Sequence, residues 1–409
     1  MRRRGIAHFT SAGIASRTTQ IGARSFEGIR RGLYSTSAQL AELDHNKLVI
    51  DRTKAPKPKI PNEQLVFGTQ FSDHMLTVEW DKEKGWDKPH IKPYQNLSLD
   101  PASSVFHYAL ECYEGMKAYK DANGKVRLFR PMENMKRFNR SCSRLVLPTI
   151  KEEELLECIK ELVRIDKDWV PQGKGYSLYL RPCMIATQNF LGVAPTGKAL
   201  CFVILSPVGP YYRSGTSSLP VRLIADTKFV RAWPGGTGNS KVGGNYGPTV
   251  LSQKEAEKMG YNQILWLYGP DHQVTEVGTM NMFVAFQHKN GEKELVTAPA
   301  TSEGVVLSGI TRDSIIQLVK QLPGWRVTER PYTMKEIVDA HDEGRLIEAF
   351  GCGTAAVVSP IQAIGYNGKE ISFPLGNSGQ AGNLTQHLAD TLAAIQYGEV
   401  PHDWSIVID

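Results

Sequence analysis

The sequence predicts an α+β fold in two domains. Segments with the residue pattern of β-strands occur in neighbouring pairs joined by short turns, and amphipathic segments of helical period lie between them. The chain has 409 residues, which is enough for two domains, and it contains no internal repeats. We divide it into a leader at residues 1–34, a smaller N-terminal domain at 35–208, a polar glycine-rich linker at 209–220 and a larger C-terminal domain at 221–409.

In the N-terminal domain, aromatic and β-branched residues indicate several strands. These lie at residues 65–80, 116–120, 126–130, 177–182 and 200–207. Asn123-Gly124 predicts a tight turn between the second and third of them. Helical spacing of apolar residues, or a proline at a helix start, predicts three helices. These are residues 104–108, a helix that begins at Pro131, and residues 151–168.

The C-terminal domain shows the same alternation of strands and helices. Strands are predicted at residues 221–226, 263–268, 274–286, 294–299 and 346–360, the last entering a glycine turn. Helices are predicted at residues 249–259, 311–321, 332–344 and 381–398. Gly260, directly after the first of these helices, is typical of a helix C-terminus.

The leader differs in composition from the rest of the chain. It contains seven arginines, one acidic residue (Glu27) and many Ser, Thr, Ala and Gly residues. This composition is typical of a transit peptide, so we expect import into the mitochondrial matrix, with cleavage around residues 33–37. The alternative is a basic arm that binds nucleic acid. Outside the leader, 41 of the 48 basic and 41 of the 42 acidic residues remain, so the charge gives no reason to expect a nucleic-acid partner.

Two further features restrict the class of protein. No apolar run approaches the ~18 residues that a membrane helix needs, so we expect no membrane partner. The six cysteines lack the spacing of a zinc site or a disulfide framework, so we expect reduced thiols and no bound metal. They stand at positions 112, 142, 158, 183, 201 and 352.

Residues 232–250, AWPGGTGNSKVGGNYGPTV, hold a lysine in a glycine-rich loop. Glycines flank Lys241 on both sides, and Tyr246 follows it. A nucleotide P-loop is excluded, because Ser240 and Val242 stand where that motif needs Gly and Ser or Thr. Two interpretations remain: a solvated lysine in a turn, or an amine that attacks a carbonyl to form a Schiff base.

A Schiff-base lysine can serve pyridoxal phosphate, which also needs a pocket for its phosphate. Ile310 and Thr311 follow Ser308-Gly309 at the start of a predicted helix, where free N–H groups and the helix dipole attract phosphate. The alternative is that Ser308 or Thr311 only caps the helix. Thr354, in the turn FGCGTAA, is a second hydroxyl candidate.

The cofactor's charge also needs partners on the protein. Arg137 can bind the phosphate, although a solvated helix arginine is the common alternative. Glu276 lies in the otherwise apolar segment VTEVGTMNMF, where a carboxylate is costly unless a cation or proton donor pairs with it. A protonated pyridine nitrogen is such a partner. The alternative is an exposed carboxylate on an edge strand.

With these residues assembled, the chain closely resembles the branched-chain amino acid aminotransferases, of the fold-type IV group of pyridoxal phosphate enzymes. The matching segments span residues 65–360 in order. They are FSDHMLTVEW, HYALECYEGMKAY, VRLFRPMENMKRF, LYLRP, FVRAWPGGTGNSKVGGNYGPT, LWLYGPDHQVTEVGTMN, SGITRDS and FGCGTAAVVSP. The resemblance implies pyridoxal 5′-phosphate as cofactor and a homodimer with the active site at the domain interface.

The resemblance also implies roles for individual residues. Lys241 forms the Schiff base, Glu276 contacts the pyridine nitrogen and Tyr246 contacts the phenolic oxygen. The other implied cofactor contacts are Arg137, Thr279, Ile310 through its N–H, Thr311 and Thr354. The implied substrate pocket consists of Phe67, Tyr108 from the second subunit, Tyr113, Tyr179, Arg181, Tyr211, Gln263, Met280, Ala355 and Ala356.

The implied reaction is transamination of leucine, isoleucine or valine with 2-oxoglutarate, giving branched-chain 2-oxo acids and glutamate. An apolar wall suits the branched side chains, and Arg181 with tyrosine hydroxyls suits glutamate. The alternatives are a D-amino acid aminotransferase or an aminodeoxychorismate lyase on the same fold, or a non-catalytic binding protein. One departure concerns Ala356 and Ser359, which replace a CxxC pair of the mammalian members, so we expect no thiol switch here.

Overall fold

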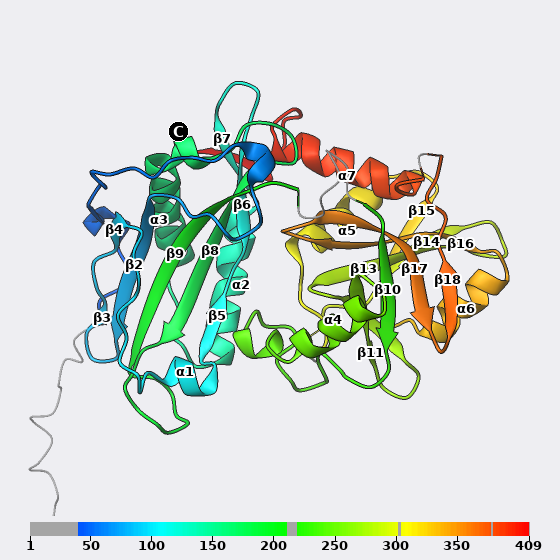
Figure 1. Ribbon diagram of the computed structural model, residues 1–409, viewed down its shortest axis with the longest axis horizontal. Coiled ribbons are helices and arrows are strands. Elements are labelled where there is room, and N and C mark those ends of the chain that lie inside the picture. The colour runs from blue at the N-terminus through cyan, green and yellow to red at the C-terminus, as the bar shows by residue number, and fades with distance from the viewer. Residues whose placement is uncertain (1–39, 211–218, 302–303, 378, 409) are drawn as a thin grey trace, which may run out of the picture. The chain divides into compact units, whose positions relative to one another are not determined.

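The described residues form an α+β fold with two β-sheets (Figure 1), as the sequence predicts. The computed structural model describes residues 40–210, 219–301, 304–377 and 379–408. Contacts group Leu40–Asp409 into one unit. The predicted leader, most of the predicted linker and Tyr211 lie outside the described residues.

The first sheet has ten strands within the described residues, in the order β1-β4-β2-β9-β8-β6-β7-β19, with β3 paired to β2 and β5 paired to β8. The strands are β1 (Val49–Ile50), β2 (His74–Asp81), β3 (Gly85–Trp86), β4 (His90–Pro93), β5 (Glu111–Tyr113), β6 (Met116–Lys120), β7 (Val126–Phe129), β8 (Ser177–Ala186), β9 (Lys198–Val208) and β19 (Ser405–Ile408). The last strand of the chain therefore belongs to the first sheet. The predicted division at residues 209–220 stays a prediction.

Two long helices cover the first sheet (Figure 1). α2 (Pro131–Arg144) and α3 (Glu152–Ile165) bury their apolar faces with the sheet in one core. α2 begins with proline at its first turn, where the missing N–H costs no hydrogen bond. The short α1 (Ser104–Tyr108) ends at Ala109 in the left-handed conformation. Four 3₁₀ turns complete the described helices: His45–Lys47, Asn62–Gln64, Lys167–Trp169 and Gly243–Asn245.

The second sheet has nine strands within the described residues, in the order β12-β11-β10-β17-β16-β13-β14-β15, with β18 paired to β17. They are β10 (Val221–Asp226), β11 (Gln263–Tyr268), β12 (Gln273–Val277), β13 (Met280–Gln287), β14 (Lys293–Thr297), β15 (Trp325–Glu329), β16 (Leu346–Gly353), β17 (Val357–Tyr366) and β18 (Lys369–Ser372). Because β12 also pairs with β13, six of these strands close into a ring. β13 belongs to this ring and is buried along almost its whole length. Its residues are accordingly apolar at nearly every position.

Four helices accompany the second sheet: α4 (Thr249–Lys258), α5 (Ile310–Val319), α6 (Met334–Asp342) and α7 (Asn383–Gln396). α5 and α7 share a core with β13 and β16, and Tyr119 and Phe129 of the first sheet enter the same core. α6 packs in a separate core, which contains other residues of β13 and β16 together with residues of β10, β11, β12 and β17. None of the helices in the described part of the chain has the length and apolarity that a bilayer span requires.

Three of the predicted strands are wrong in their extent. Residues 346–360 contain β16, a turn at residues 354–356 and the start of β17. The other two each contain a glycine turn. Residues 65–73 are not strand, because the chain turns at Gly68, which has φ +72°, and β2 begins only at His74. Residues 274–286 form two strands, since Gly278 with φ +55° begins a hairpin turn after which Met280 pairs with Val277. In both cases a continuous apolar pattern hid a glycine turn.

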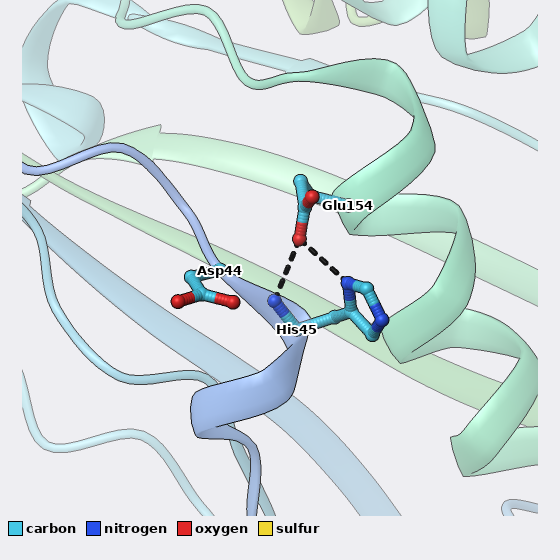
Figure 2. Close-up of side chains that lie close together, drawn as sticks. All are labelled: Asp44, His45 and Glu154. Carbon is cyan, nitrogen blue, oxygen red and sulfur yellow. Dashed lines mark hydrogen bonds and ion pairs between the residues drawn. The ribbon is translucent and has the colours of Figure 1, made fainter.

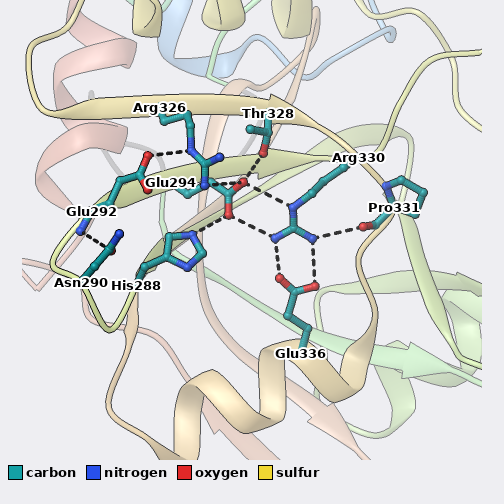
Figure 3. Close-up of polar contacts among 9 residues, drawn as sticks. All are labelled: His288, Asn290, Glu292, Glu294, Arg326, Thr328, Arg330, Pro331 and Glu336. Carbon is teal, nitrogen blue, oxygen red and sulfur yellow. Dashed lines mark hydrogen bonds and ion pairs between the residues drawn. The ribbon is translucent and has the colours of Figure 1, made fainter.

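Glu294 organises a charged network beside β14 and β15 (Figure 3). Its oxygens accept hydrogen bonds from Thr328 Oγ1 at 2.5 Å and Arg330 Nη2 at 3.2 Å, and they lie 2.8 Å from His288 Nε2. Arg330 also pairs with Glu336. Burial alone would raise the pKa of Glu294, but these hydrogen bonds outweigh it and lower its pKa to about 2.

We expect Glu294→Gln to destabilise the protein by about 2–3 kcal/mol at pH 7, because it removes a buried, hydrogen-bonded charge. The pKa of the native carboxyl is below that of the unfolded chain, so its stabilising effect is complete above about pH 4.5 and is lost as the pH falls toward 2. Urea unfolding at pH 7 and pH 3.5 measures both effects. Glu292→Gln, which removes an exposed ion pair with Arg326, should cost under about 1 kcal/mol. A stability difference that does not shrink at the lower pH would contradict the assignment.

Candidate active site

The main chain of Lys241 is held from two directions. Its N–H donates to Ser141 Oγ of α2 at 2.8 Å, and its carbonyl accepts from the N–H of Tyr113 in β5 at 3.0 Å. The glycine loop allows close contact, because a Cβ on Gly238 would lie 2.2 Å from the carbonyl oxygen of Gly304. The lysine is therefore fixed at its backbone while its side chain stays free to react.

Lys241 is half-buried, and its amine lies next to two tyrosines. Nζ is 3.3 Å from Tyr246 Oη, and it stands 4.7 Å from the ring centre of Tyr113. Burial raises the pKa of Tyr113. For Tyr246, burial is opposed by the charges of Lys241 and Arg231 and by a hydrogen bond from Tyr113, and these together lower its pKa. Tyr246 is thus prepared to carry negative charge on its oxygen.

Glu276 is buried, so the alternative of an exposed edge-strand carboxylate is wrong. One oxygen accepts from the N–H of Leu307 at 2.9 Å and from Asn281 Nδ2 at 3.1 Å, and the other lies 2.9 Å from Arg231 Nη1. Burial raises the pKa of Glu276, although Arg231 and these hydrogen bonds oppose the shift. Arg231 Nε has no hydrogen-bond partner among the described residues.

Arg137 is also buried, and it is not a solvated helix arginine. Its Nε and Nη2 donate to the two oxygens of Glu114 at 2.7 and 2.9 Å, and Nη1 donates to the carbonyl of Ser308 at 3.0 Å. Burial would raise the pKa of Glu114, but Arg137 lowers it below its ordinary value. This contact connects α2 with the segment that leads into α5.

The start of α5 has no capping side chain among the described residues. Gly309 is its N-cap and offers no side chain, so neither Ser308 nor Thr311 caps the helix. Thr311 Oγ1 instead donates to the carbonyl of Gly353 at 3.3 Å. Ile310, Thr311 and Thr354 line one small cavity. Uncapped N–H groups, two hydroxyls and the nearby Arg137 are the donors that a phosphate requires.

An aromatic cluster adjoins Lys241 through Tyr113. Phe67 packs edge-on against Tyr179 with ring centres 4.9 Å apart, and Arg181 Nη2 donates to Tyr179 Oη at 3.2 Å. The Arg181 guanidinium also stands 4.5 Å from the ring centre of Tyr113. The glycine turn at residue 68, which the strand prediction missed, is what places Phe67 in this cluster.

The remaining predicted site residues lie outside the aromatic cluster. Met280 packs against Gly351 and Gly353 of β16, close to the turn with Ala355 and Ala356. Gln263 lies beside Gly278, and Thr279 is exposed in the hairpin turn. Tyr108 does not reach this site, since its hydroxyl donates to the carbonyl of Leu191.

Sequence reasoning missed four buried residues of the site: Ser141, Arg231, Glu114 and Asn281. Arg231 stands in the matched segment FVRAWPGG, and a charge inside that apolar stretch was an available signal. Glu114 and Asn281 gave none, because their partners Arg137 and Leu307 are distant in the chain.

Asp44, His45 and Glu154 form a separate polar group (Figure 2). Glu154 Oε2 accepts from the main-chain N–H of His45 at 2.7 Å and lies 2.7 Å from His45 Nδ1. Asp44 caps the first 3₁₀ turn through the N–H of Asn46. These structural hydrogen bonds account for the group, which contains none of the predicted site residues.

Comparisons with known proteins identify the family of the chain. Residues 111–364 match the family described as amino-transferase class IV. A branched-chain-amino-acid aminotransferase of Dictyostelium discoideum is 54% identical over 92% of this chain and 98% of its own. The cytosolic and mitochondrial enzymes of Saccharomyces cerevisiae are 52% and 51% identical, each over 90% of this chain and over 98% and 94% of their own. A solved branched-chain amino acid aminotransferase with pyridoxamine 5′-phosphate has a TM-score of 0.64 at 27% identity, over 81% of this chain and 98% of its own.

The fold and the lysine site thus define a class IV aminotransferase, of a family that works with pyridoxal phosphate. Within this class, the chain belongs to the branched-chain amino acid aminotransferases.

Proposed function

We propose that this chain exchanges the amino group of leucine, isoleucine or valine for the oxo group of 2-oxoglutarate, with pyridoxal 5′-phosphate bound at Lys241. The observation that carries the proposal is the amine of Lys241, fixed 3.3 Å from Tyr246 and within electrostatic range of both Glu114 and Glu276. Relatives with these names at about half identity support the choice of substrates.

The residues present fit the cofactor. The N–H groups of Ile310 and Thr311, with the hydroxyl of Thr354 and the charge of Arg137, suit its phosphate. The buried Glu276 suits a protonated ring nitrogen, and the unpartnered Arg231 Nε marks a polar space near that carboxylate. The group supplies an electron sink for the bonds at the substrate's Cα.

Lys241 performs the proton transfers in this proposal. Its amine would hold the cofactor. Once released, that amine would act as the base that takes the Cα proton of the amino acid and as the acid that returns a proton. The anchored backbone keeps the amine in place for both steps, since Ser141 and Tyr113 hold residue 241 independently of its side chain.

Two features of the pocket determine which substrates bind: an aromatic surface and a guanidinium group. Phe67, Tyr113 and Tyr179 give an aromatic surface for a branched aliphatic side chain. Arg181, which already donates to Tyr179, is the candidate for the second carboxylate of glutamate or 2-oxoglutarate. Ala355, Ala356 and Met280 would complete the pocket.

We further propose a homodimer in which Tyr108 completes the partner's site. α1 and the loop that follows β8 expose the apolar side chains of Phe106, Phe190, Leu191 and Val193, the last with 80% of its area accessible. The Tyr108 hydroxyl ties these two segments together through Leu191. An exposed patch of this kind is typical of a subunit interface.

We predict that the mature protein lacks its first residues. The arginine-rich leader is typical of mitochondrial import, although the relatives include cytosolic as well as mitochondrial forms. N-terminal sequencing of protein purified from mitochondria should give a start near residues 33–37. A start at Met1 would reject both the leader and its cleavage.

A coupled assay of L-leucine with 2-oxoglutarate, recorded with the absorption spectrum, tests the main proposal. A parallel panel with D-alanine and aminodeoxychorismate tests the sister activities of the fold. Turnover of either compound in preference to L-leucine would overturn the substrate assignment. A protein without cofactor absorbance and without turnover would instead be the non-catalytic binding protein.

A further inference from the structure

Residues 58–70 form a loop that carries Phe67 into the aromatic cluster of the candidate active site. The loop contains the 3₁₀ turn Asn62–Gln64 and the glycine turn at residue 68. Phe67 contacts Tyr179 edge-on, with ring centres 4.9 Å apart. A surface loop of this length whose two ends lie close together is an Ω-loop, a class that frequently serves function.

Lys57 closes the neck of this loop. Its Nζ donates to the carbonyls of Phe71 at 3.0 Å and Ser72 at 2.6 Å. Its main-chain N–H donates to Asp73 Oδ1 at 2.8 Å. The ammonium also stands 4.5 Å from the ring centre of Tyr94, which stacks on the ring of Phe71. One residue thus joins the entry of the loop to its exit through three hydrogen bonds.

Both sides of the neck are fixed to the first sheet. On the entry side, the N–H of Thr53 donates to Nε2 of the buried His74 in β2 at 2.9 Å. On the exit side, the N–H of Ser72 donates to the carbonyl of Leu205 in β9 at 2.9 Å. β9 pairs with β8, the strand that carries Tyr179. The neck therefore has a fixed position relative to the aromatic cluster.

The tip of the loop is shaped by a local turn. Thr69 donates to the carbonyl of Val66 from its N–H at 3.3 Å and from Oγ1 at 3.0 Å. Asn62 Nδ2 donates to the carbonyl of Gln172 at 3.0 Å, in an exposed contact. Substitution of Lys57 removes the two side-chain hydrogen bonds of the neck and leaves these contacts in place.

The ammonium of Lys57 is partly withdrawn from water, although the residue as a whole is exposed. Burial lowers the pKa of Lys57, and the charges of Asp73 and Asp166 oppose this shift. Hydrogen bonds from an ammonium are charge-assisted and are stronger than those between neutral groups. The side chain is thus placed to hold the neck closed.

We propose that Lys57 is a positioning residue that fixes Phe67 against the substrate pocket and thereby increases the preference for large aliphatic side chains over short ones. The inference rests on the proposed function and adds to it a residue outside the pocket. Because Lys57 acts through Phe67, it affects recognition of the substrate's side chain and leaves the proton transfers at Lys241 unchanged.

The test measures kcat and KM of the holoenzyme for L-leucine and for L-2-aminobutyrate, which lacks two methyl groups of leucine. We expect Lys57→Met to lower the ratio of the two kcat/KM values about fivefold or more, through KM, with kcat for leucine within about twofold of wild type. Lys57→Arg keeps a charged donor and should retain the ratio within about twofold. Lys54→Met, at an exposed lysine of the same segment, is the matched control and should leave it unchanged. An equal loss on both substrates would show that Lys57 only stabilises the fold, and would overturn the proposal.

A double-mutant cycle with Phe67→Ala tests whether the two residues act together. Phe67→Ala should itself lower the preference for leucine. Adding Lys57→Met to it should lower the preference by less than about twofold more, since no ring remains to be positioned. Effects that multiply in the double variant would contradict the proposal.

Hydrogen exchange tests the closure of the loop without any turnover. In Lys57→Met the amides of residues 66–69 should exchange about tenfold faster than in wild type, whereas those of β8 and β9 keep their rates. Unchanged exchange in the loop, or faster exchange throughout the sheet, refutes the assignment. Lys57→Gln gives the same comparison if Lys57→Met does not fold. A wild type that does not transaminate leucine would refute the proposed reaction, while the exchange result would still decide whether Lys57 closes the loop.

Discussion

Lys241→Ala should abolish transamination of L-leucine, lowering kcat by at least about 10⁴-fold. The variant loses both the covalent anchor and the base that removes the Cα proton, and no second amine stands at the Tyr246 hydroxyl among the described residues. The visible absorbance of the bound cofactor should shift away from that of the Schiff base. Initial rates in the coupled assay and an absorption spectrum measure the two effects.

The same variant should fold normally. Two hydrogen bonds of residue 241 involve its main chain, to Ser141 Oγ and from the N–H of Tyr113, and alanine keeps both. Among the described residues, only the side-chain hydrogen bond from Nζ to Tyr246 Oη is lost. The midpoint of urea unfolding should therefore change by no more than a surface substitution would cause. Lys228→Ala is the matched control, since Lys228 is an exposed lysine of the same connecting segment. More than about 1% residual kcat in Lys241→Ala would reject the catalytic assignment.

The fold class followed from periodicity, but the closure of the second sheet did not. Strands such as Gln263–Tyr268 and helices such as Pro131–Arg144 are local, so their patterns and starting residues revealed them. The pairing of β12 with β13 depends on Gly278, whose positive φ inside an apolar run has no unique sequence signal. The return of Ser405–Ile408 to the first sheet is a long-range pairing that periodicity also does not reveal.

The candidate site also contains features that local sequence predicts and long-range contacts that it does not. A partner for Glu276 was predictable, because a carboxylate in an apolar run needs one. The loop alone left Lys241 open between a solvated lysine and a Schiff-base amine, and the candidate partner residues with the family resemblance favoured the second. The identity of the partner of Glu276 was not predictable. Arg231 lies 45 residues before Glu276, and only the folded ring brings the two within 2.9 Å. The hydrogen bond from Lys117 Nζ to the carbonyl of Ala355 illustrates the same limit, since it joins positions 238 residues apart.

Substitution of Glu276 should have large effects on both kcat and the free energy of unfolding. Variants of this residue can distinguish its role in the reaction from its role in stability. Glu276→Ala should lower kcat by about 10³-fold, because a ring nitrogen without this carboxylate loses its proton and the cofactor becomes a weaker electron sink. It should also destabilise the protein by about 3–5 kcal/mol, since Arg231 then stays buried without its ion pair and the N–H of Leu307 without its acceptor.

The double variant Arg231→Met/Glu276→Ala distinguishes the two roles. Removing the orphaned cation should recover part of the lost stability, because the energetic coupling of the pair disappears with both partners. It should recover none of the rate, since the missing carboxylate is what the chemistry requires. Urea unfolding and the coupled leucine assay on the four proteins of this cycle give both quantities. A double variant that regains both stability and rate would reduce Glu276 to a structural partner of Arg231, whereas one that regains stability alone makes the carboxylate essential to the reaction.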